Sequence, residues 1–375
     1  MRRSLPTILA AGILIHSPLV LAREAANIRA LQIGPVGSGS AFTEMKREEF
    51  EYNILSFSRN AEATAGPNEL KADAQGWRHS LGWGRVFNPE FHFTAALAVD
   101  TEDFTAKSDD FEYSQSRSSV TINAGPTLRT GNLVLGSQVW LTKMNDQTTE
   151  ISRYQKSYSR KTPGVQLPAL HGYIGIVDGH SAVIAGVKTF NGKKVTADIE
   201  NADGDTIKHG VVQYSPGLVH LDWLWYGAER MRVAAGFTLL VHNGSQVSHP
   251  SDGDYEFSGL SDTAKDNQIV WDLGARYSAL PTVDFVGGIK LVTASHDSDA
   301  KIGLQHDELG SYKFSFGIHS LMGTGRFFFD VDYGKARTAR FEALGKNSDD
   351  WVNAQETVSI AEESWALHLG AALVL

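Results

Sequence analysis

The stretch that decides the fold reads Phe91-His92-Phe93-Thr94-Ala95-Ala96-Leu97-Ala98-Val99-Asp100. Its odd-numbered positions carry Phe, Phe, Ala, Leu and Val, whereas its even-numbered positions carry His, Thr, Ala, Ala and Asp. Successive side chains of a β-strand point to opposite faces, so this alternation predicts a strand whose two faces meet different surroundings.

The same two-residue period recurs in residues 231–242, 269–278, 283–291, 312–319, 326–333 and 365–375, each with one apolar face. A soluble β-sandwich also alternates, but its outer face meets bulk water and is rich in Lys, Glu and Thr. Here the second face carries small residues with occasional charges, which suits the limited room inside a barrel. We therefore expect an all-β fold, a transmembrane antiparallel up-and-down β-barrel.

The amino-acid composition excludes several classes of protein and of functional site. The chain contains no cysteine, which excludes disulfides, thiolate metal sites and thiol nucleophiles. Its formal net charge is −9, whereas nucleic-acid binding rewards a basic balance. Beyond the N-terminus no stretch approaches the roughly 18 apolar residues that a membrane-spanning helix needs. A spanning protein without such helices must be a closed barrel, because lipid offers backbone groups no hydrogen-bond partner.

The N-terminus predicts export. Arg2 and Arg3 precede an apolar run from Leu5 to Leu21, and Ala22 supplies the small residue at a cleavage site, which is the pattern of a secretory signal peptide. A membrane anchor is the alternative, but two prolines and a histidine interrupt the run. The expected organisation is a signal peptide at 1–22, a periplasmic N-terminal segment at 23–47 and an outer-membrane β-barrel at 48–375.

Connections alternate between short and long, as they do in outer-membrane barrels. Tight turns are predicted at Asn88-Pro89-Glu90, Thr130-Gly131, Asp178-Gly179, Asn191-Gly192, Asp203-Gly204, Ser215-Pro216-Gly217, Gly227-Ala228-Glu229, Leu280-Pro281 and Gly323-Thr324-Gly325. Long polar loops are predicted at Arg59–Gln75, Thr105–Gln115, Asn145–Pro168, Asn243–Asp266, His296–His306 and Ala339–Glu362. All long loops fall on one side if Lys193–Glu200 is a strand of its own. That gives about 16 strands, or about 14 if the weakest hairpin is dropped.

Aromatic residues gather near the ends of the predicted strands: Trp77, Trp83, Trp223, Trp225, Tyr226, Tyr277, Tyr312, Tyr333 and Trp365. Such residues form interfacial girdles in transmembrane barrels, although sandwich cores use aromatics too.

The C-terminus carries a resemblance. His368, Gly370, Leu373 and Leu375 fill the positions of the β-signal of outer-membrane barrel proteins, a polar residue and a glycine followed by two apolar residues separated by one. The resemblance implies recognition of the last strand by the barrel-assembly machinery. The chain departs from the pattern at its end, where Phe is commoner than Leu. No narrower family is evident, since the Asn-Pro-Ala feature of long-chain fatty-acid transporters is absent.

The phase of the strands predicts a set of charges that point into the lumen: Asp100, Asp222, Arg232, Asp272, Arg276, Asp284, Lys290, Lys313, Arg326, Asp330 and Asp332. Barrels of this size usually leave an aqueous channel, and opposed charges across it select solutes by charge and size. The alternative is a lattice of salt bridges that merely satisfies the interior. On the first hypothesis, neutralising Asp272 and Arg276 changes ion selectivity without preventing assembly.

The sequence offers two other kinds of candidate site, a hydrolase site and metal sites. His242 and Ser245 lie close in sequence, as in some outer-membrane lipases, but no Gly-x-Ser-x-Gly elbow and no orienting third group is evident. Four acidic clusters lack the spacing of a calcium loop and are expected to be solvated turns, although loop acids could bridge to lipopolysaccharide through divalent cations. These clusters are Asp203-Gly204-Asp205, Asp252-Gly253-Asp254, Asp297-Ser298-Asp299 and Asp349-Asp350.

The expected function is a pore for passive or weakly selective diffusion of small polar solutes. The alternative is a structural or surface-interaction barrel with a closed lumen, and a lipid hydrolase comes third. We expect no cofactor and no metal, and we expect lipopolysaccharide and outer-membrane lipid as partners. The Gly- and Ser-rich segment Arg23–Arg47 is predicted to be a flexible tail or a lumen plug. Nothing in the sequence identifies an oligomer interface.

Overall fold

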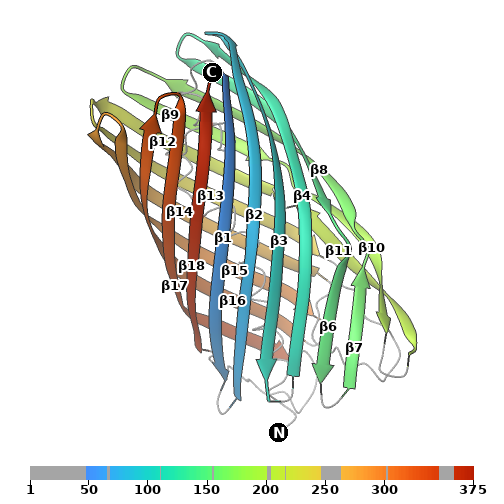
Figure 1. The fold of residues 1–375 in the computed structure, drawn as a ribbon. Coiled ribbons are helices and arrows are strands. Elements are labelled where there is room, and N and C mark those ends of the chain that lie inside the picture. The colour runs from blue at the N-terminus through green and yellow to red at the C-terminus, as the bar shows by residue number, and fades with distance from the viewer. Residues whose placement is uncertain are drawn as a thin grey trace.

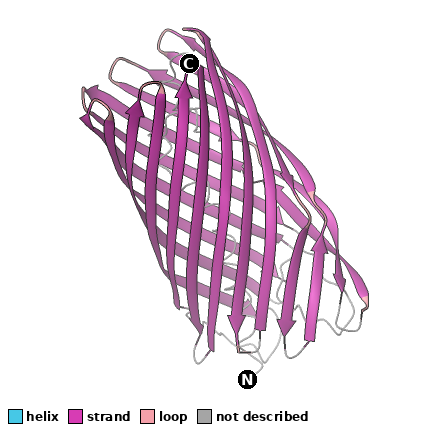
Figure 2. Cartoon of the chain, viewed as in Figure 1, coloured by secondary structure: helices cyan, strands magenta, loops and turns pink. Residues whose placement is uncertain are grey.

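The computed structural model describes residues 48–65, 68–109, 111–153, 156–200, 204–215, 217–245, 263–300, 303–345 and 359–375. Regular structure in these ranges consists entirely of β-strands (Figure 2). No helix in the described part of the chain is long and apolar enough to cross a bilayer. The predicted signal peptide and the segment Arg23–Arg47 lie outside the described residues.

The strands follow one another along the chain (Figure 1). They are β1 (Glu48–Ala65), β2 (Asn68–Asn88), β3 (Phe91–Ser108), β4 (Phe111–Thr130), β5 (Leu133–Met144), β6 (Gln147–Arg153), β7 (Lys156–Thr162), β8 (Val165–Val177), β9 (Ser181–Lys188), β10 (Asn191–Glu200), β11 (Thr206–Ser215), β12 (Gly217–Ala228), β13 (Met231–Ser245), β14 (Thr263–Leu280), β15 (Val283–Ala300), β16 (Gly303–Met322), β17 (Gly325–Gly345) and β18 (Ser359–Val374).

A closed ring of 14 antiparallel strands forms the barrel. Its members in spatial order are β1, β2, β3, β4, β5, β8, β9, β12, β13, β14, β15, β16, β17 and β18. The ring closes through a long ladder in which Glu49 of β1 faces Val374 of β18 at one end and Thr64 faces Ser359 at the other. Closure leaves no open sheet edge in the ring, which is the condition for a sheet to stand in lipid.

The remaining strands, β6, β7, β10 and β11, prolong strands of the ring at one end. Lys188 of β9 faces Leu218 of β12, and Asn191 of β10 faces Ser215 of β11 in the same register. The segment that the sequence suggested as a separate spanning strand is therefore an extension of β9. This is why the ring contains 14 strands, the smaller of the two numbers that the sequence allowed.

The turn end of the barrel carries six tight connections, at Pro89-Glu90, Gly131-Asn132, Asp178–His180, Glu229-Arg230, Pro281-Thr282 and Gly323-Thr324. These turns were predicted and are confirmed. Gly131 and Gly323 have φ values of 59° and 65°, a left-handed conformation that glycine adopts without strain. The two described chain ends meet here, since Leu375 N donates to Glu48 O at 2.9 Å.

The opposite end, which we call the loop end, differs from the sequence prediction. Segments predicted as loops are largely strand: β1 runs to Ala65 and β2 starts at Asn68, inside the predicted loop Arg59–Gln75. The turns predicted at Asn191-Gly192 and Ser215-Pro216-Gly217 are instead the start of β10 and the junction of β11 with β12. Beyond the membrane both faces of a strand meet water, so polar sequence is not a sign of a loop there.

The two faces of the wall have opposite chemistry. On β14, the side chains of Ile269, Trp271, Leu273 and Tyr277 point outward and are exposed, whereas alternate residues point inward and are buried. The exposed apolar side chains continue around the ring and form a belt that only lipid can cover favourably. Tyr226 is an exception among the predicted girdle residues, because it packs inward and its hydroxyl donates to Asp178 O at 2.6 Å.

One interruption of the ladder lies where β8 runs beside β9 and β10. Pairing between β8 and β9 ends at His171 opposite Lys188, and pairing between β7 and β10 resumes only at Lys161 opposite Asp198. Pro168 has no N–H with which to continue the ladder, and its carbonyl accepts a hydrogen bond from the side chain of Asn191 at 2.5 Å instead. In this described stretch no backbone pair joins residues 162–168 to residues 191–197. We call it the β8–β10 break.

Candidate functional site in the barrel interior

The inner wall of β12 to β15 carries an apolar patch near the loop end. We call it the loop-end patch; it is formed by Leu218, Leu240, Val270 and Val292, all of which are buried. Cross-strand register aligns them, since Leu218 faces Leu240 and Val270 faces Val292. The patch therefore spans four neighbouring strands on their inner side.

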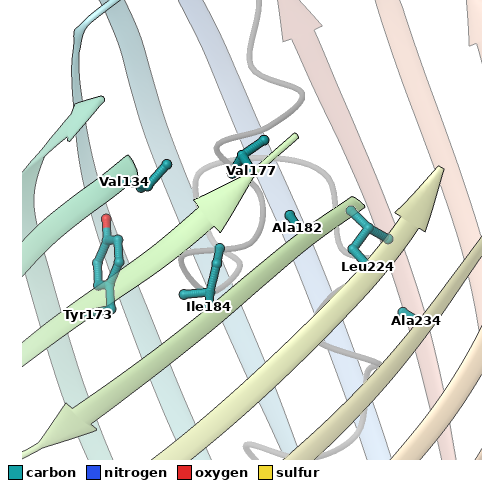
Figure 3. Close-up of a cluster of buried hydrophobic side chains, with 7 residues drawn as sticks. All are labelled: Val134, Tyr173, Val177, Ala182, Ile184, Leu224 and Ala234. Carbon is teal, nitrogen blue, oxygen red and sulfur yellow. The ribbon is translucent and has the colours of Figure 1, made fainter. Parts of the chain in front are cut away.

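A second apolar cluster, the turn-end patch, lines the inner wall nearer the tight turns (Figure 3). It is formed by Val134, Tyr173, Val177, Ala182, Ile184, Leu224 and Ala234. The Tyr173 hydroxyl is hydrogen-bonded to Thr127, so the one polar atom of the cluster is satisfied. An aqueous pore would carry water-facing groups at these positions.

A charged row separates the two patches. Asp222 of β12 faces Gly236 of β13, Gly236 faces Asp272 of β14, and Asp272 faces Lys290 of β15. A Cβ atom on Gly236 would lie 2.5 Å from Asp272 Oδ1, so the glycine provides the space that this carboxylate occupies. All three charged side chains are buried.

Two buried histidines extend the row toward β8. His220 Nδ1 lies 2.7 Å from Asp222 Oδ2, and His220 Nε2 lies 3.0 Å from His171 Nε2. In the neutral pair His220 donates to the carboxylate and accepts from the ring N–H of His171. The imidazoles meet over Gly186, where a Cβ would collide with His220 Nε2 and approach His171 Nε2 to 3.0 Å. Sequence reasoning missed both histidines, although each occupies the inward phase of its strand.

Ion pairs between neighbouring strands satisfy much of the remaining interior. Arg78 Nε donates to Asp100 at 2.8 Å, Arg117 Nε donates to Glu102 at 2.6 Å, Arg276 Nε donates to Asp284 at 2.7 Å, and Arg59 is paired with Glu362. Removing one partner of such a buried pair leaves the other charge uncompensated, which costs about 3–5 kcal/mol. The phase of the strands predicted that Asp100, Arg276 and Asp284 point inward. The sequence did not single out the other members of these pairs, because pairing depends on register: Arg59, Arg78, Glu102, Arg117 and Glu362.

Asp330 joins two more histidines across three strands. Its carboxylate oxygens lie 2.9 Å from His319 Nε2 and 3.3 Å from His368 Nδ1. The ring of Phe328 lies beside both imidazoles, with centroids 5.6 and 5.7 Å away, and it occupies the space that a side chain on Gly370 would need. An aromatic residue therefore reaches into the interior here.

The predicted assembly signal falls on both faces of the last strand, β18. His368 and Gly370 point inward to the cluster just described, whereas Leu373 and Leu375 are exposed on the outer side. The spacing of the signal thus corresponds to one polar inner face and one apolar outer face. Its recognition by an assembly machinery stays a prediction.

All of the predicted lumen charges lie on the inner side of the wall: Asp100, Asp222, Arg232, Asp272, Arg276, Asp284, Lys290, Lys313, Arg326, Asp330 and Asp332. They come from many strands. Most are buried and many are paired, which is the arrangement expected of a salt-bridge lattice. Their role in selecting solutes stays a prediction.

The structure gives no side-chain geometry that supports the predicted hydrolase site or the acidic clusters. His242 and Ser245 lie at the loop end of β13, and their side chains are outside the described part of the structure. Of the acidic clusters, Asp252-Gly253-Asp254 and Asp349-Asp350 are outside the described residues. Among the described residues no group of three or more His, Asp or Glu side chains could hold a metal ion.

Comparisons with known proteins support the fold. No protein-family model matches the chain, and no curated protein matches it by sequence. Among solved structures, a Pseudomonas aeruginosa FadL homologue has 10% identity and a TM-score of 0.62 over 92% of this chain and 93% of that one. The Pseudomonas putida toluene transporter TodX has 10% identity and a TM-score of 0.58, over 94% and 97%.

The Ralstonia pickettii toluene transporter TbuX has 11% identity and a TM-score of 0.53, over 93% of this chain and 99% of that one. Such low identities show a shared fold and nothing narrower. The closed ring, the apolar outer belt and the likeness in fold to these transporters agree with one another. The chain is a β-barrel of the membrane-spanning kind.

Proposed function

We propose that the protein is an outer-membrane channel through which small apolar solutes are taken up. The observation that carries this proposal is the inner wall itself, because the loop-end and turn-end patches place buried apolar side chains on the lumen side of a barrel whose outer side is already apolar. Transfer of an apolar molecule from water to an apolar surface is favourable. These patches therefore offer a favourable binding surface to apolar solutes.

The buried charges support the same proposal over the passive polar pore that the sequence suggested. Charges that are paired and removed from solvent, such as Arg276 with Asp284, do not line a wide water-filled passage. The neighbours in fold include two described as toluene transporters, and we transfer that property to this chain as part of the proposal.

The β8–β10 break supports a sideways route. The exposed apolar side chains of Leu170, Val187 and Phe190 lie on the outer surface beside it. Strands without ladder hydrogen bonds can separate there at little cost, so an apolar solute can leave the lumen through the wall without crossing the charged row.

The paired interior also suits the alternative of a closed barrel that acts only through its surface. One experiment separates the apolar-solute channel, the polar pore and the closed barrel.

Cells that express the protein are compared with cells that do not for uptake of radiolabelled toluene across the lipopolysaccharide-bearing outer membrane. The purified protein is tested for conductance in planar bilayers and for sugar permeation in liposomes. Faster toluene uptake without sugar permeation supports the proposal. Sugar permeation with large steady conductance indicates the polar pore, and neither activity indicates the closed barrel.

A further inference from the structure

One buried amide in the interior has no hydrogen-bond partner among the residues that the structure describes. Gln268 lies on the inner face of β14 with 1% of its surface exposed, and neither its Nε2 nor its Oε1 makes a hydrogen bond. A buried donor or acceptor left unsatisfied costs about 1–3 kcal/mol. By contrast, Gln138, the buried glutamine on the inner face of β5, donates to Thr94 Oγ1 at 3.3 Å.

The surroundings of Gln268 are the loop-end patch. Leu240 faces it from β13, and Val270 is the next inward residue on its own strand. The charged row begins one inward position further toward the turn end, at Asp272. Among the side chains that the structure describes here, the amide is therefore the polar group of an apolar surface.

We infer that Gln268 and the loop-end patch form a binding subsite for a small apolar molecule that carries one neutral hydrogen-bonding group, of which a phenolic or alcoholic hydroxyl is the simplest. This inference rests on the proposed function and narrows the class of solute. The amide presents a donor and an acceptor side by side, so it matches a group that can both accept and donate. An ionised group is disfavoured by the described side chains around the amide, because Leu240 and Val270 carry no charge and an uncompensated buried charge is costly.

The position of the subsite fits an early step in uptake. It lies on the loop-end side of the charged row, so a solute that enters from the loop end meets it before the row. A pure hydrocarbon would gain the apolar contacts but leave the amide unsatisfied. A hydroxylated aromatic of the same size would gain both, and the subsite therefore favours the hydroxylated molecule.

The test uses toluene and p-cresol, which differ by one hydroxyl group, and measures their binding to the purified full-length protein in detergent by titration calorimetry. We expect p-cresol to bind more tightly than toluene. Gln268→Leu keeps the size of the side chain but removes both polar atoms, so p-cresol affinity should fall roughly tenfold while toluene affinity does not fall. Gln268→Met, which is unbranched, should give the same result. Gln138→Leu is the matched control and should not change the ratio of the two affinities.

The outcomes separate the inference from the function on which it rests. If toluene binds but p-cresol binds no better, or if Gln268→Leu and Gln268→Met weaken both probes equally, the subsite is disproved and the channel proposal stands. If the wild-type protein binds neither probe, both proposals are wrong. A selective loss of p-cresol binding in the two Gln268 variants, and not in Gln138→Leu, supports the subsite.

Discussion

At the scale of single residues, the interior depends on glycines that make room for polar side chains. Gly186→Ala would drive a methyl group into His220, which is held by Asp222 and cannot move aside without losing that hydrogen bond. We expect the variant to be destabilised by about 1–3 kcal/mol, the usual range for an overpacked interior. Urea unfolding of the barrel in lipid vesicles measures this change.

Gly172→Ala is the matched control for that prediction. Gly172 lies on the outward face of β8, and a Cβ added there meets nothing within 4 Å. Its replacement should change the free energy of unfolding by less than about 0.5 kcal/mol. Equal effects of the two substitutions would show that the histidine pair is not packed as described.

Some inward-facing residues could be predicted from the sequence and others could not. The two-residue period put Asp272 and Arg276 on the inner face, and the structure places them there. It did not reveal the apolar patches, because the loop-end patch joins single apolar residues of four strands, such as Leu218 and Val270, which only cross-strand register brings together. An apolar residue in the inward phase, such as Val270, was the available signal. The contact between His171 and His220 could not be predicted, since it joins residues on different strands that are far apart in sequence.

At the scale of strands, the β8–β10 break is the feature to test, and the absence of native cysteine makes the test clean. Cysteines introduced at Pro168 and Asn191 face each other across the break, where the Asn191 side chain contacts the Pro168 carbonyl. Joining them with a short bifunctional thiol reagent should slow toluene uptake several-fold, because the strands can no longer separate. Cleaving a reducible version of the same cross-link should restore uptake.

Ile176 and Val183 provide the control pair for this cross-link. They face each other in the intact part of the β8–β9 ladder and are both exposed on the outer side. A cross-link between two strands that are already hydrogen-bonded should leave toluene uptake unchanged. Uptake that is unaffected by the cross-link at the break would rule out the sideways route.

The strand scale explains why the number of strands was open in the sequence. Placing all long loops on one side required Lys193–Glu200 to be a strand of its own, and the structure contains it within β10. Alternation reports only that a segment is extended, however, and not whether it crosses the membrane. The continuous register from Lys188 opposite Leu218 to Asn191 opposite Ser215 is what makes β10 an extension of β9.

At the scale of the whole molecule, the fold is an inverted one in which the largest apolar surface faces outward. In a soluble protein Leu273, which is 52% exposed, would tolerate almost any substitution. In this barrel it lies midway along the outward apolar row of β14, between Ile269 and Tyr277, and therefore near the middle of the lipid belt.

Leu273→Arg should then cost about 2–4 kcal/mol of unfolding free energy in lipid vesicles, because the charge must enter the hydrocarbon. Thr105→Arg, at an exposed position near the loop end of β3 between the exposed charges of Asp103 and Lys107, should cost no more than about 1 kcal/mol, since its side chain is already beyond the belt. The difference between the two variants measures whether lipid covers the outer face. If Leu273→Arg cost as little as Thr105→Arg, water and not lipid would cover the outer face, and the channel proposal would be wrong together with the membrane assignment.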